Sequence, residues 1–317
     1  MDIMKKVVST RQLPYSNQPF QLETLEFGRA PTHSEILNTA KEAWALVTTL
    51  EDKINQELLK ELPNLKAIAQ FAVGTNNIDL DYCRAHNIIV TNTPDVLTEA
   101  TAELTFALML NCARQIHRAA PDVSTGKWIG WEPMGHLGIA LKNKKLGIVG
   151  AGRIGQRIAE MARGAFDMQI LYHNRKAHLD FEKKNQATLL SLHELLKESD
   201  VIVLMTPLTP ETRSLINQKE LLLMKKDAIL INTSRGEIMN QEDLIDVLKK
   251  DHLFAVGLDV TTPEPLPQNS PLNSIERVLI TPHIGSATRE ARAQMAQLCF
   301  DNLERIAKDL KPLTPVS

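Results

Sequence analysis

The sequence predicts an α/β protein of two domains, in which a doubly wound parallel sheet is inserted into a smaller α/β domain. Three observations lead to this prediction. The chain has 317 residues, which is more than a single hydrophobic core comfortably serves. Short apolar runs alternate with amphipathic stretches along most of the chain, as they do where helices cover parallel strands. A glycine-rich turn at residues 150–155 then opens a second series of such runs, after a stretch long enough for another domain.

Residues 1–99 and 288–317 are predicted to form the smaller domain, with a flavodoxin-like arrangement. Residues 52–62 carry apolar side chains at helical spacing. A last helix, from about residue 287 to 310, has one apolar stripe and no strand after it, so we expect it to pack back on this domain. The tail that follows, residues 311–317, is expected to be mobile. The strands expected here are Lys6–Ser9, Ala45–Thr48, Lys66–Phe71 and Ile88–Thr91.

Residues 100–287 are predicted to form the larger domain, a doubly wound sheet of the Rossmann type. A long apolar helix, expected from residue 98 to about residue 117, leads into it. The expected strands are nearly continuous apolar runs, which suits parallel strands buried on both faces. Ligands of such sheets bind at the carboxyl ends of the strands. These strands are Leu146–Val149, Gln169–Tyr172, Val201–Met205, Ala228–Ile231, Ala255–Leu258 and Val278–Ile280.

The turn after the first strand of this series is typical of a dinucleotide-binding site. Gly150, Gly152 and Gly155 have the GxGxxG spacing between an apolar run and a helix-forming stretch. Gly150 permits a tight turn, and Gly152 lets backbone approach a pyrophosphate without an intervening Cβ. Gly155 lets the helix pack close to the strand, and the free N–H groups at the helix start attract phosphate charge.

The end of the second strand favours NADP(H) over NAD(H), although NAD(H) remains possible. An acidic residue usually binds the adenosine ribose hydroxyls here when NAD is preferred. This chain has Asn174, Arg175 and Lys176 instead, and no acid before Asp180. Arg175 can bind a 2′-phosphate with a planar fork, Lys176 adds charge, and Asn174 avoids repulsion. A solvated basic loop is the alternative, which explains the charges but not the missing carboxylate.

Three polar residues just beyond strand ends point to reduction of a 2-oxo acid. Arg235, Glu264 and His283 each follow a different strand of the larger sheet. His283 can donate a proton to a carbonyl, Glu264 can orient the imidazole and favour its charged form, and Arg235 can bind a carboxylate. Alternatively, His283 is a hydrogen-bonded structural residue, and Arg235 with Glu264 is an ion pair between domains.

Composition argues against several other classes of function. The net charge of −2 and the pI of about 6.5 give no field that would attract nucleic acid or an anionic membrane. Cys83, Cys112 and Cys299 lie far apart, form no metal-ligand spacing and are typical of thiols in a reducing compartment. Residues 1–6 lack the pattern of a signal peptide. We therefore expect a cytoplasmic protein without a metal.

Further motifs carry a resemblance to a known family. They are Val73–Asp79, Thr91–Glu103, Gly126–Pro133, Thr206–Thr212, Asn232–Gly236 and Thr281–Thr288. Together with the glycine turn, and in this order, they make the chain resemble the D-isomer-specific 2-hydroxyacid dehydrogenases. Within that family it is most similar to glyoxylate/hydroxypyruvate reductases. The similarity runs from about residue 71 to residue 302.

The resemblance implies a reductase of small 2-oxo acids, with assigned roles for several residues. Arg235, Glu264 and His283 would be the catalytic set, with His283 as the acid/base. Backbone N–H groups at Val73 and Gly74 would help to hold the substrate carboxylate. The family is usually a homodimer whose two domains close over the substrate.

The same resemblance assigns contacts to cofactor and partner. Asp259 would meet the nicotinamide amide. Trp131 matches a position that reaches the substrate pocket of a dimer partner, although ordinary interface or core packing is an equal alternative. Further residues that would line the cofactor are Thr101, Arg153, Ile154, Thr206, Pro207, Thr212, Thr233 and Gly285.

Three functions remain open at this point. The first is an NADPH-preferring reductase of glyoxylate and hydroxypyruvate. The second is an NAD-dependent phosphoglycerate dehydrogenase or broad D-2-hydroxyacid dehydrogenase, which more often has an acid at the end of the second strand. The third is a binding protein that senses dinucleotides, like the transcriptional co-repressors of this fold. We expect no long disordered tails for partner docking, which argues against this third function.

Overall fold

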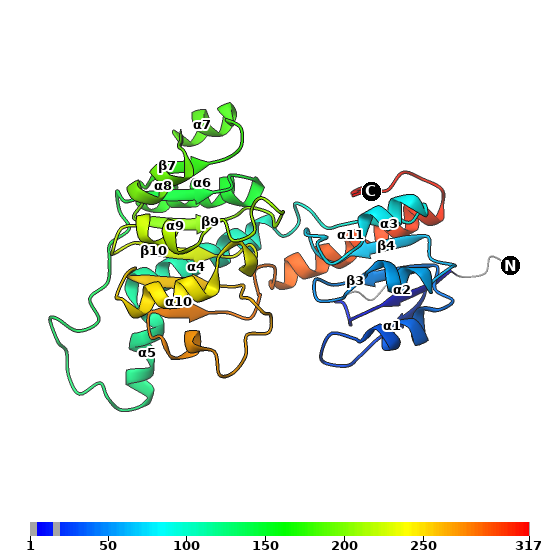
Figure 1. Ribbon diagram of the computed structural model, residues 1–317, viewed down its shortest axis with the longest axis horizontal. Helices are drawn as coiled ribbons and strands as arrows, with labels where there is room; N and C mark the ends of the chain where they lie inside the picture. Colours follow the sequence, from blue (N-terminus) through cyan, green and yellow to red (C-terminus); the bar gives the residue numbers. More distant parts are fainter. Residues whose placement is uncertain (1–4, 15–19, 317) are drawn as a thin grey trace. The chain divides into compact units, whose positions relative to one another are not determined.

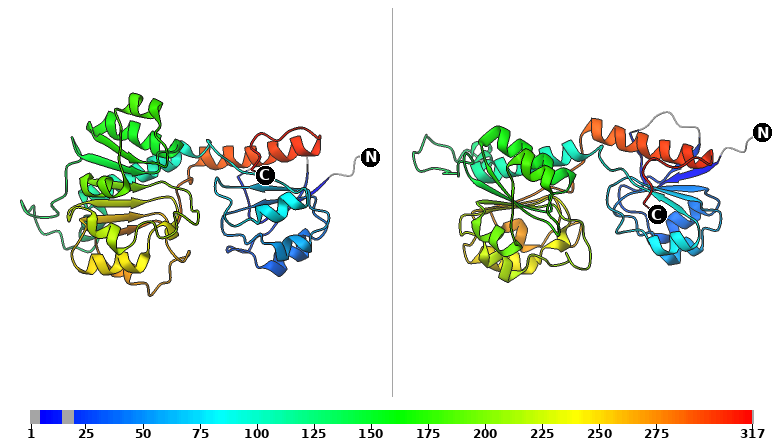
Figure 2. Two further views of the ribbon diagram at one scale, coloured as in Figure 1. Left: turned by 45° about the horizontal axis from the view of Figure 1, so that its top comes forward. Right: turned by 90° about the horizontal axis from the view of Figure 1, so that it is seen from above.

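The computed structural model describes residues 5–14 and 20–316, which form two compact units. Unit 1 comprises Met1–Leu97 and Ser286–Ser317, and unit 2, Thr98–Gly285, is inserted between these two parts of the chain. Each unit is built on one sheet (Figures 1 and 2). Most of the segment used to argue against a signal peptide, and the last residue of the tail, lie outside the described residues.

The sheet of unit 1 has the strand order β2-β1-β3-β4-β5, and all of its strands are parallel. This is the flavodoxin-like order that the sequence analysis expected. Strand β2 was not predicted, because it is a short edge strand whose side chains are mostly solvent-accessible. The strands are β1 (Lys6–Ser9), β2 (Gln21–Thr24), β3 (Ala45–Thr48), β4 (Ala67–Gln70) and β5 (Ile89–Thr91).

Helices cover both faces of this sheet. On one face α1, α2 and α3 share a core with the strands, built from side chains such as Ile36, Leu58 and Cys83. Helix α11 packs on β4 and lies on the opposite face in Figure 2. The helices are α1 (His33–Ala40), α2 (Gln56–Lys60), α3 (Leu80–Ala85) and α11 (Arg289–Ala307).

The C-terminal tail is held in place, so the prediction of a mobile tail is wrong for its described part. The side chain of Asn302, which is buried in α11, accepts hydrogen bonds from the N–H groups of Leu313 and Thr314 at 2.8 and 3.1 Å. Thr314 Oγ1 in turn donates to the carbonyl of Asn92 at 2.6 Å. A buried amide that pairs with backbone fixes a segment whose composition alone suggests mobility.

Unit 2 contains the predicted doubly wound sheet, with strand order β12-β11-β10-β9-β6-β7-β8. All six predicted strands form and run parallel. The two-residue edge strand β8 was not predicted, because both of its side chains are exposed and give no periodic signal. The strands are β6 (Lys145–Val149), β7 (Gln169–His173), β8 (Thr188–Leu189), β9 (Val201–Leu204), β10 (Ile229–Asn232), β11 (Ala255–Leu258) and β12 (Val278–Ile280).

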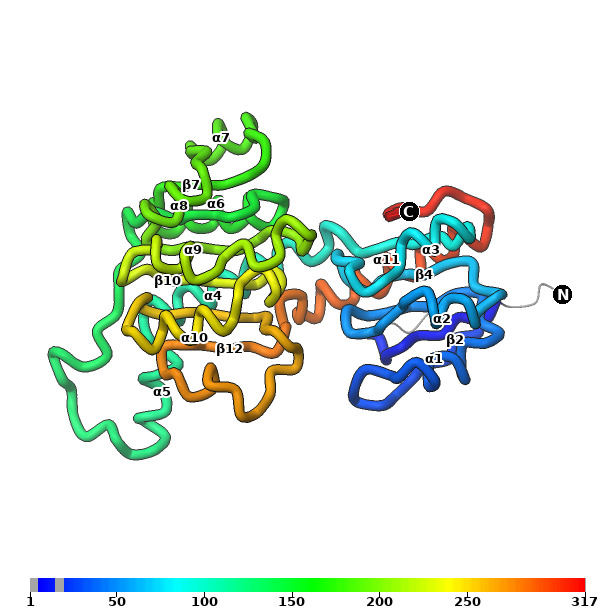
Figure 3. The backbone as a smooth tube through the Cα atoms, viewed as in Figure 1, coloured from blue at the N-terminus to red at the C-terminus, as the bar shows by residue number. Residues whose placement is uncertain are grey.

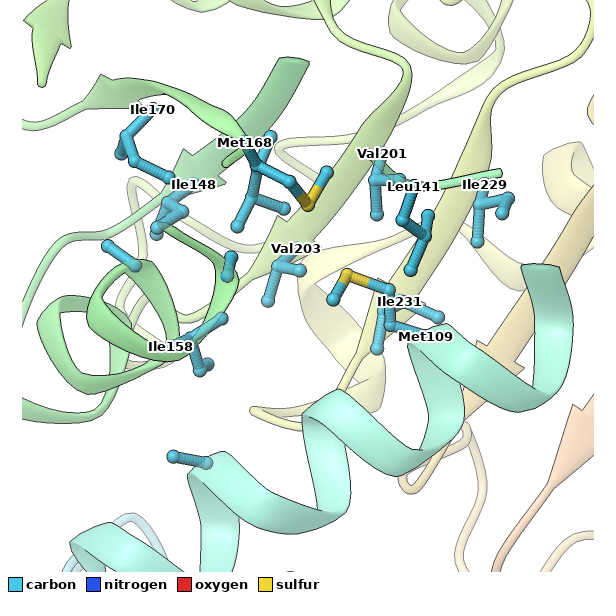
Figure 4. Packing of buried hydrophobic residues seen from close by; sticks show 14 of the residues in the cluster. Met109, Leu141, Ile148, Ile158, Met168, Ile170, Val201, Val203, Ile229 and Ile231 are labelled. Carbon is cyan, nitrogen blue, oxygen red and sulfur yellow. The ribbon is translucent and has the colours of Figure 1, made fainter. Parts of the chain in front are cut away.

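This sheet is buried on both faces, which explains why its strands are continuous apolar runs. Helices α4 and α6 cover one face, where Met109 and Ile158 pack towards Val203 and Ile231 (Figure 4). Helices α8, α9 and α10 cover the other face. The helices of unit 2 are α4 (Thr98–Arg114), α5 (Ile116–Ser124), α6 (Arg153–Phe166), α7 (Leu179–Asn185), α8 (Leu192–Glu198), α9 (Gln218–Leu223) and α10 (Gln241–Lys249), with 3-10 turns η1 (Gly236–Ile238) and η2 (Pro271–Ser274).

The long helix expected to end near residue 117 is broken earlier, so its predicted end is wrong. Gln115 adopts a left-handed conformation with φ of 53°, which separates α4 from α5. The side chain of Asn111 then accepts a hydrogen bond from the N–H of His117 at 3.0 Å. After α5 the chain runs without regular structure to β6, as a loop that leaves the body of unit 2 (Figure 3).

Candidate active site

The candidate site lies along the carboxyl edge of the unit 2 sheet. In the sheet, β7 lies on one side of β6 and β9 lies on the other side. The strands β10, β11 and β12 continue outward from β9. The strand order therefore reverses between β6 and β9, and a crevice at such a reversal is where doubly wound sheets bind ligands. Gly150 follows β6 and Thr206 follows β9, so both residues lie at this point.

The glycine turn has the geometry that a bound dinucleotide requires. Gly150 has φ of +100°, and a Cβ on it would lie 2.8 Å from backbone atoms of Met205 and Thr206. A Cβ on Gly155 would lie 2.6 Å from the carbonyl oxygen of Gly150. Gly152 differs, since a Cβ there would meet nothing within 4 Å and would project into open space. Gly150 and Gly155 are therefore needed for the close packing of the turn. Gly152 instead keeps the outer surface of the turn free of side-chain atoms.

Two observations fit a phosphate-bearing cofactor at this turn. Helix α6 begins directly after Gly152, which has no side chain to cap the first N–H groups of the helix. Across the reversal, the hydroxyl of Thr206 is buried, and within residues 5–14 and 20–316 nothing bonds to it. An uncapped helix start attracts anions, and a buried hydroxyl without a partner costs free energy until a ligand pairs with it.

The end of β7 carries the residues predicted to select the cofactor. Asn174 Oδ1 accepts a hydrogen bond from the N–H of Ala151 at 2.8 Å, which ties the end of β7 to the glycine turn. Arg175 and Lys176 follow and are exposed to solvent. An aspartate could accept the same hydrogen bond, so this contact does not require the neutral amide of Asn174.

Asp259, at the end of β11, organises the loop that contains His283. Its carboxylate accepts hydrogen bonds from Thr281 Oγ1 at 2.6 Å and from the N–H groups of Ile284 and Gly285, both at 2.8 Å. Burial raises the pKa of Asp259, which is 1% exposed, although these donors and the charge of His283 act in the opposite direction. The side chain of Asp259 therefore fixes the loop that contains His283. It also lies at the strand end where a contact with the cofactor was predicted.

His283 and Glu264 form the hydrogen-bonded pair that the sequence analysis expected. His283 Nδ1 lies 2.9 Å from Glu264 Oε2, and the side chains are 29% and 33% exposed. The other carboxylate oxygen of Glu264 accepts the N–H of Thr261 at 3.0 Å. Burial alone would raise the pKa of Glu264, but the bonds from His283 and Thr261 and the charge of Arg235 hold it below its ordinary value.

His283 also has an unusual backbone conformation. Its φ is 51°, in the left-handed region that non-glycine residues rarely adopt. The N–H of His283 lies 3.0 Å from the carbonyl oxygens of both Asp259 and Thr281, which stabilises this turn. Such conformations concentrate at functional sites, where the surrounding structure fixes a side chain in one direction.

Arg235 lies beside this pair and acts on it through its charge. Its Nη1 donates to the carbonyl of Ser234 at 2.6 Å, and burial lowers its pKa while the charges of Glu264 and Glu237 raise it. Gly236 follows, and a Cβ there would overlap the carbonyl oxygen of Thr261. Only glycine lets the segments after β10 and β11 approach so closely, which brings Arg235 near Glu264.

Other predicted cofactor residues lie on the same edge of unit 2. Thr212 Oγ1 donates to the carbonyl of Pro207 at 2.7 Å and so closes the loop after β9. Thr233 Oγ1 pairs at 2.7 Å with Thr105 Oγ1 of α4, while Thr101 of the same helix lies next to Gly285. The remaining two predicted cofactor residues, Arg153 and Ile154, lie in the first turn of α6.

Two predicted substrate residues belong to unit 1, in the turn after β4. Val73 is 41% exposed, and its carbonyl accepts a hydrogen bond from Asn92 at 2.8 Å. The carbonyl of Gly74 accepts one from the buried side chain of Gln70 at 3.1 Å. Both carbonyls are therefore turned towards the body of unit 1, and fixed side chains hold the turn.

Trp131 lies in the loop between α5 and β6 and is 83% exposed. Its neighbours Trp128, Ile129 and Met134 are also exposed, at 66%, 97% and 76%. An exposed apolar surface of this kind is typical of an interaction site. Core packing, one of the two alternatives for Trp131, is excluded within this chain.

Sequence reasoning missed one residue that contacts the loop between β11 and β12, which carries Glu264. The side chain of Gln241, the first residue of α10, forms two hydrogen bonds with the backbone of Thr262. Nothing in the local sequence signals this contact, because it joins segments 21 residues apart.

Across the described ranges no helix is long and apolar enough to span a membrane, and no cluster of His, Cys, Asp and Glu there could hold a metal.

Comparison with known proteins places these features in a family context. Residues 106–285 match the family described as D-isomer specific 2-hydroxyacid dehydrogenase, NAD binding domain. The chain is 46% identical over 312 residues to the glyoxylate reductase of Thermococcus litoralis, with 96% of this chain and 94% of that protein covered.

Solved structures show the same similarity in three dimensions. The TT0316 protein from Thermus thermophilus superposes with a TM-score of 0.91 at 42% identity, covering 98% of this chain and 100% of that one. An acyclic imino acid reductase, solved in complex with NADPH and D-Arg, gives 0.87 at 26% identity, with 98% and 100% covered.

Proposed function

The chain belongs to the D-isomer-specific 2-hydroxyacid dehydrogenases, and we propose that within this family it reduces glyoxylate and hydroxypyruvate with NADPH. Membership makes it an enzyme that reduces 2-oxo acids with a nicotinamide dinucleotide. The proposal goes further in naming the substrates, the preferred cofactor and the residues that act. The hydrogen-bonded pair of His283 and Glu264, at the edge where such sheets bind ligands, is the observation that carries it.

The three polar residues divide the chemistry among them. The guanidinium of Arg235 binds the substrate carboxylate and polarises the adjacent carbonyl. When bound, the reduced dinucleotide supplies a hydride to the carbonyl carbon. Because Nδ1 of His283 faces Glu264, Nε2 is the nitrogen that gives its proton to the carbonyl oxygen. Glyoxylate gives the achiral glycolate and hydroxypyruvate gives the D-2-hydroxy acid. The imidazole is left neutral, with its remaining proton directed at Glu264.

Unit 2 has the groups needed to hold the dinucleotide, and we assign residues 100–287 as the NAD(P)-binding domain. The pyrophosphate would lie over Gly152 at the start of α6, where backbone N–H groups are uncapped. The hydroxyl of Thr206 would gain the hydrogen-bond partner that it lacks within the described residues. Residues 1–99 and 288–317 would then bind substrate, with the N–H groups of Val73 and Gly74 directed at its carboxylate.

The preference for NADPH rests on the end of β7. Arg175 and Lys176 are exposed there, and no carboxylate stands in the position that selects NAD. A similar imino acid reductase was solved with NADPH, which is consistent with this preference. NAD(H) would be used less efficiently, because it lacks the 2′-phosphate that these cations would bind.

The loop around Trp131 supports a homodimer. Its exposed tryptophans and aliphatic side chains would cost free energy in water, and a second copy of the chain would bury them. In such a dimer Trp131 would reach the substrate pocket of the partner. The buried and unpaired thiols of Cys83, Cys112 and Cys299 are consistent with a reducing, cytoplasmic location.

A steady-state panel tests this proposal. Glyoxylate, hydroxypyruvate, pyruvate and 3-phosphohydroxypyruvate are each assayed with NADPH and with NADH. We expect the highest kcat/KM with glyoxylate or hydroxypyruvate and NADPH. Preference for 3-phosphohydroxypyruvate with NADH would instead identify a phosphoglycerate dehydrogenase. Absence of turnover with all four acids, despite nucleotide binding, would favour a dinucleotide-sensing protein.

A further inference from the structure

We propose that Gln241 is a positioning residue for Glu264, acting through the backbone of Thr262. This inference rests on the proposed role of the His283–Glu264 pair. Gln241 Nε2 donates to the carbonyl of Thr262 at 2.7 Å, and the N–H of Thr262 donates to Gln241 Oε1 at 3.0 Å. One primary amide thus satisfies both backbone groups of a residue that lies two positions before Glu264.

Gln241 can perform this role because its own backbone is fixed. It is the first residue of α10, directly after the N-cap residue Asn240. Asn240 Oδ1 accepts the N–H groups of Glu242 and Asp243 at 3.1 and 3.2 Å, which anchors the first turn of the helix. The amide of Gln241 therefore extends from a rigid element to an exposed segment of loop.

The loop that receives this contact is braced on its other side as well. The carbonyl of Thr261 packs so tightly against Gly236 that a Cβ there would overlap it. Thr261 Oγ1 donates to the carbonyl of Pro263 at 2.9 Å, and the N–H of Thr261 binds Glu264 Oε1. With the contact from Gln241, residues 261–264 are held between η1 and α10.

This bracing matters because Glu264 must satisfy two donors at once. One oxygen accepts the N–H of Thr261 at 3.0 Å and the other faces His283 Nδ1 at 2.9 Å. A small displacement of the loop would lengthen the second bond and stabilise the protonated imidazole less. Arg235 and Asp259 also face the pair, with Glu237 close to Arg235, and a change at Gln241 leaves all three charges in place.

The substitution Gln241→Met isolates the effect. A methionine side chain has a similar length but no amide, so both bonds to the backbone of Thr262 are lost and no charge is added. Methionine is a good helix former, so α10 itself should not be weakened. The matched control is Glu242→Gln, at the next position of the same turn.

The readout is the pH dependence of kcat/KM for glyoxylate with NADPH. We expect kcat/KM for Gln241→Met to fall more at alkaline pH than at neutral pH, because a displaced Glu264 supports the proton-donating imidazole less. Glu242→Gln should match the wild type, and the melting temperature and Kd for NADPH should be unchanged in both variants. A purely structural role would lower the rate equally at every pH.

Two outcomes would overturn the inference, and they are distinguishable from failure of the proposed function. A profile of Gln241→Met that superposes on the wild type, or a uniform loss of rate, shows that Gln241 does not act through Glu264. If Glu264→Gln shifts the alkaline fall of kcat/KM in the same experiment, the proposed function stands and only the inference fails. If Glu264→Gln shifts nothing, the role of Glu264 itself fails.

Discussion

Replacing Glu264 by glutamine tests the proposed pair most sharply, because the geometry predicts a specific deficit. The carboxylate of Glu264 accepts hydrogen bonds from both the N–H of Thr261 and Nδ1 of His283. A glutamine side chain has one acceptor oxygen and one donor nitrogen, so it can satisfy only one of these donors. The variant Glu264→Gln therefore removes a charge and one hydrogen bond while preserving the shape of the side chain.

The size of the effect follows from the contact. A hydrogen bond to a charged group contributes about 1.5–3 kcal/mol, and opposite charges 4 Å apart attract by about 1–4 kcal/mol between bulk water and a protein surface. Both side chains are about one-third exposed, so we take the lower part of these ranges, about 1.5 kcal/mol. Since about 1.4 kcal/mol corresponds to a factor of ten, kcat/KM at alkaline pH should fall roughly tenfold.

The assay is the pH profile of kcat/KM for glyoxylate at saturating NADPH. Reduction needs a proton on His283, so activity falls at alkaline pH, and this alkaline limb should begin at a lower pH in Glu264→Gln. Glu237→Gln is the control, because it removes a charge near Arg235 without touching His283. An unmoved limb in Glu264→Gln, or an equal shift in both variants, would refute the reasoning.

Three further variants test other parts of the account. Arg175→Ala should raise the KM for NADPH about tenfold or more and barely affect NADH, and equal effects on both cofactors would remove Arg175 from phosphate binding. Arg235→Lys should lower kcat/KM by roughly 10–100-fold, because an ammonium cannot reproduce the guanidinium fork; an unchanged value would contradict substrate binding there. Gly236→Ala should destabilise the protein in urea by roughly 1–3 kcal/mol, since its Cβ would overlap the Thr261 carbonyl. Gly164→Ala is the matched control, with nothing within 4 Å of the added Cβ, and a similar loss in both variants would refute the packing argument.

Much of the fold could be predicted because local sequence dictates it. The apolar runs that became β6 to β12, apart from β8, reflect strands buried on both faces. The glycine spacing at 150–155 is fixed by the turn, since Gly150 has a positive φ and a Cβ on Gly155 would collide with the carbonyl oxygen of Gly150. These are contacts between near neighbours in sequence, so a single segment carries the signal.

The candidate residues were found for a different reason. Arg235, Glu264 and His283 come from separate segments, but each directly follows a strand of one parallel sheet. Parallel strands bring their carboxyl ends to one edge, so position relative to the strands was enough to group them. The bond between Glu264 and His283 follows from that grouping, although its length does not.

The features that escaped prediction depend on tertiary contacts. At the break after α4, the side chain of Gln115 donates to the carbonyl of Leu137. The tail docks on the buried side chain of Asn302. The contact of Gln241 with Thr262 likewise needs α10 and the loop after β11 to be placed first. Apolar spacing suggested a longer helix, and the proline content of the tail suggested mobility. Neither property reveals a specific tertiary hydrogen bond.

The proposed reaction requires His283 to donate a proton to the substrate carbonyl beside a bound dinucleotide. The most direct test is the turnover number for glyoxylate with NADPH in His283→Ala, measured together with the Kd for NADPH. We expect a loss of about 10²–10⁴-fold in kcat with an unchanged Kd, because the imidazole acts on the substrate and not on nucleotide binding. A kcat close to that of the wild type would contradict it.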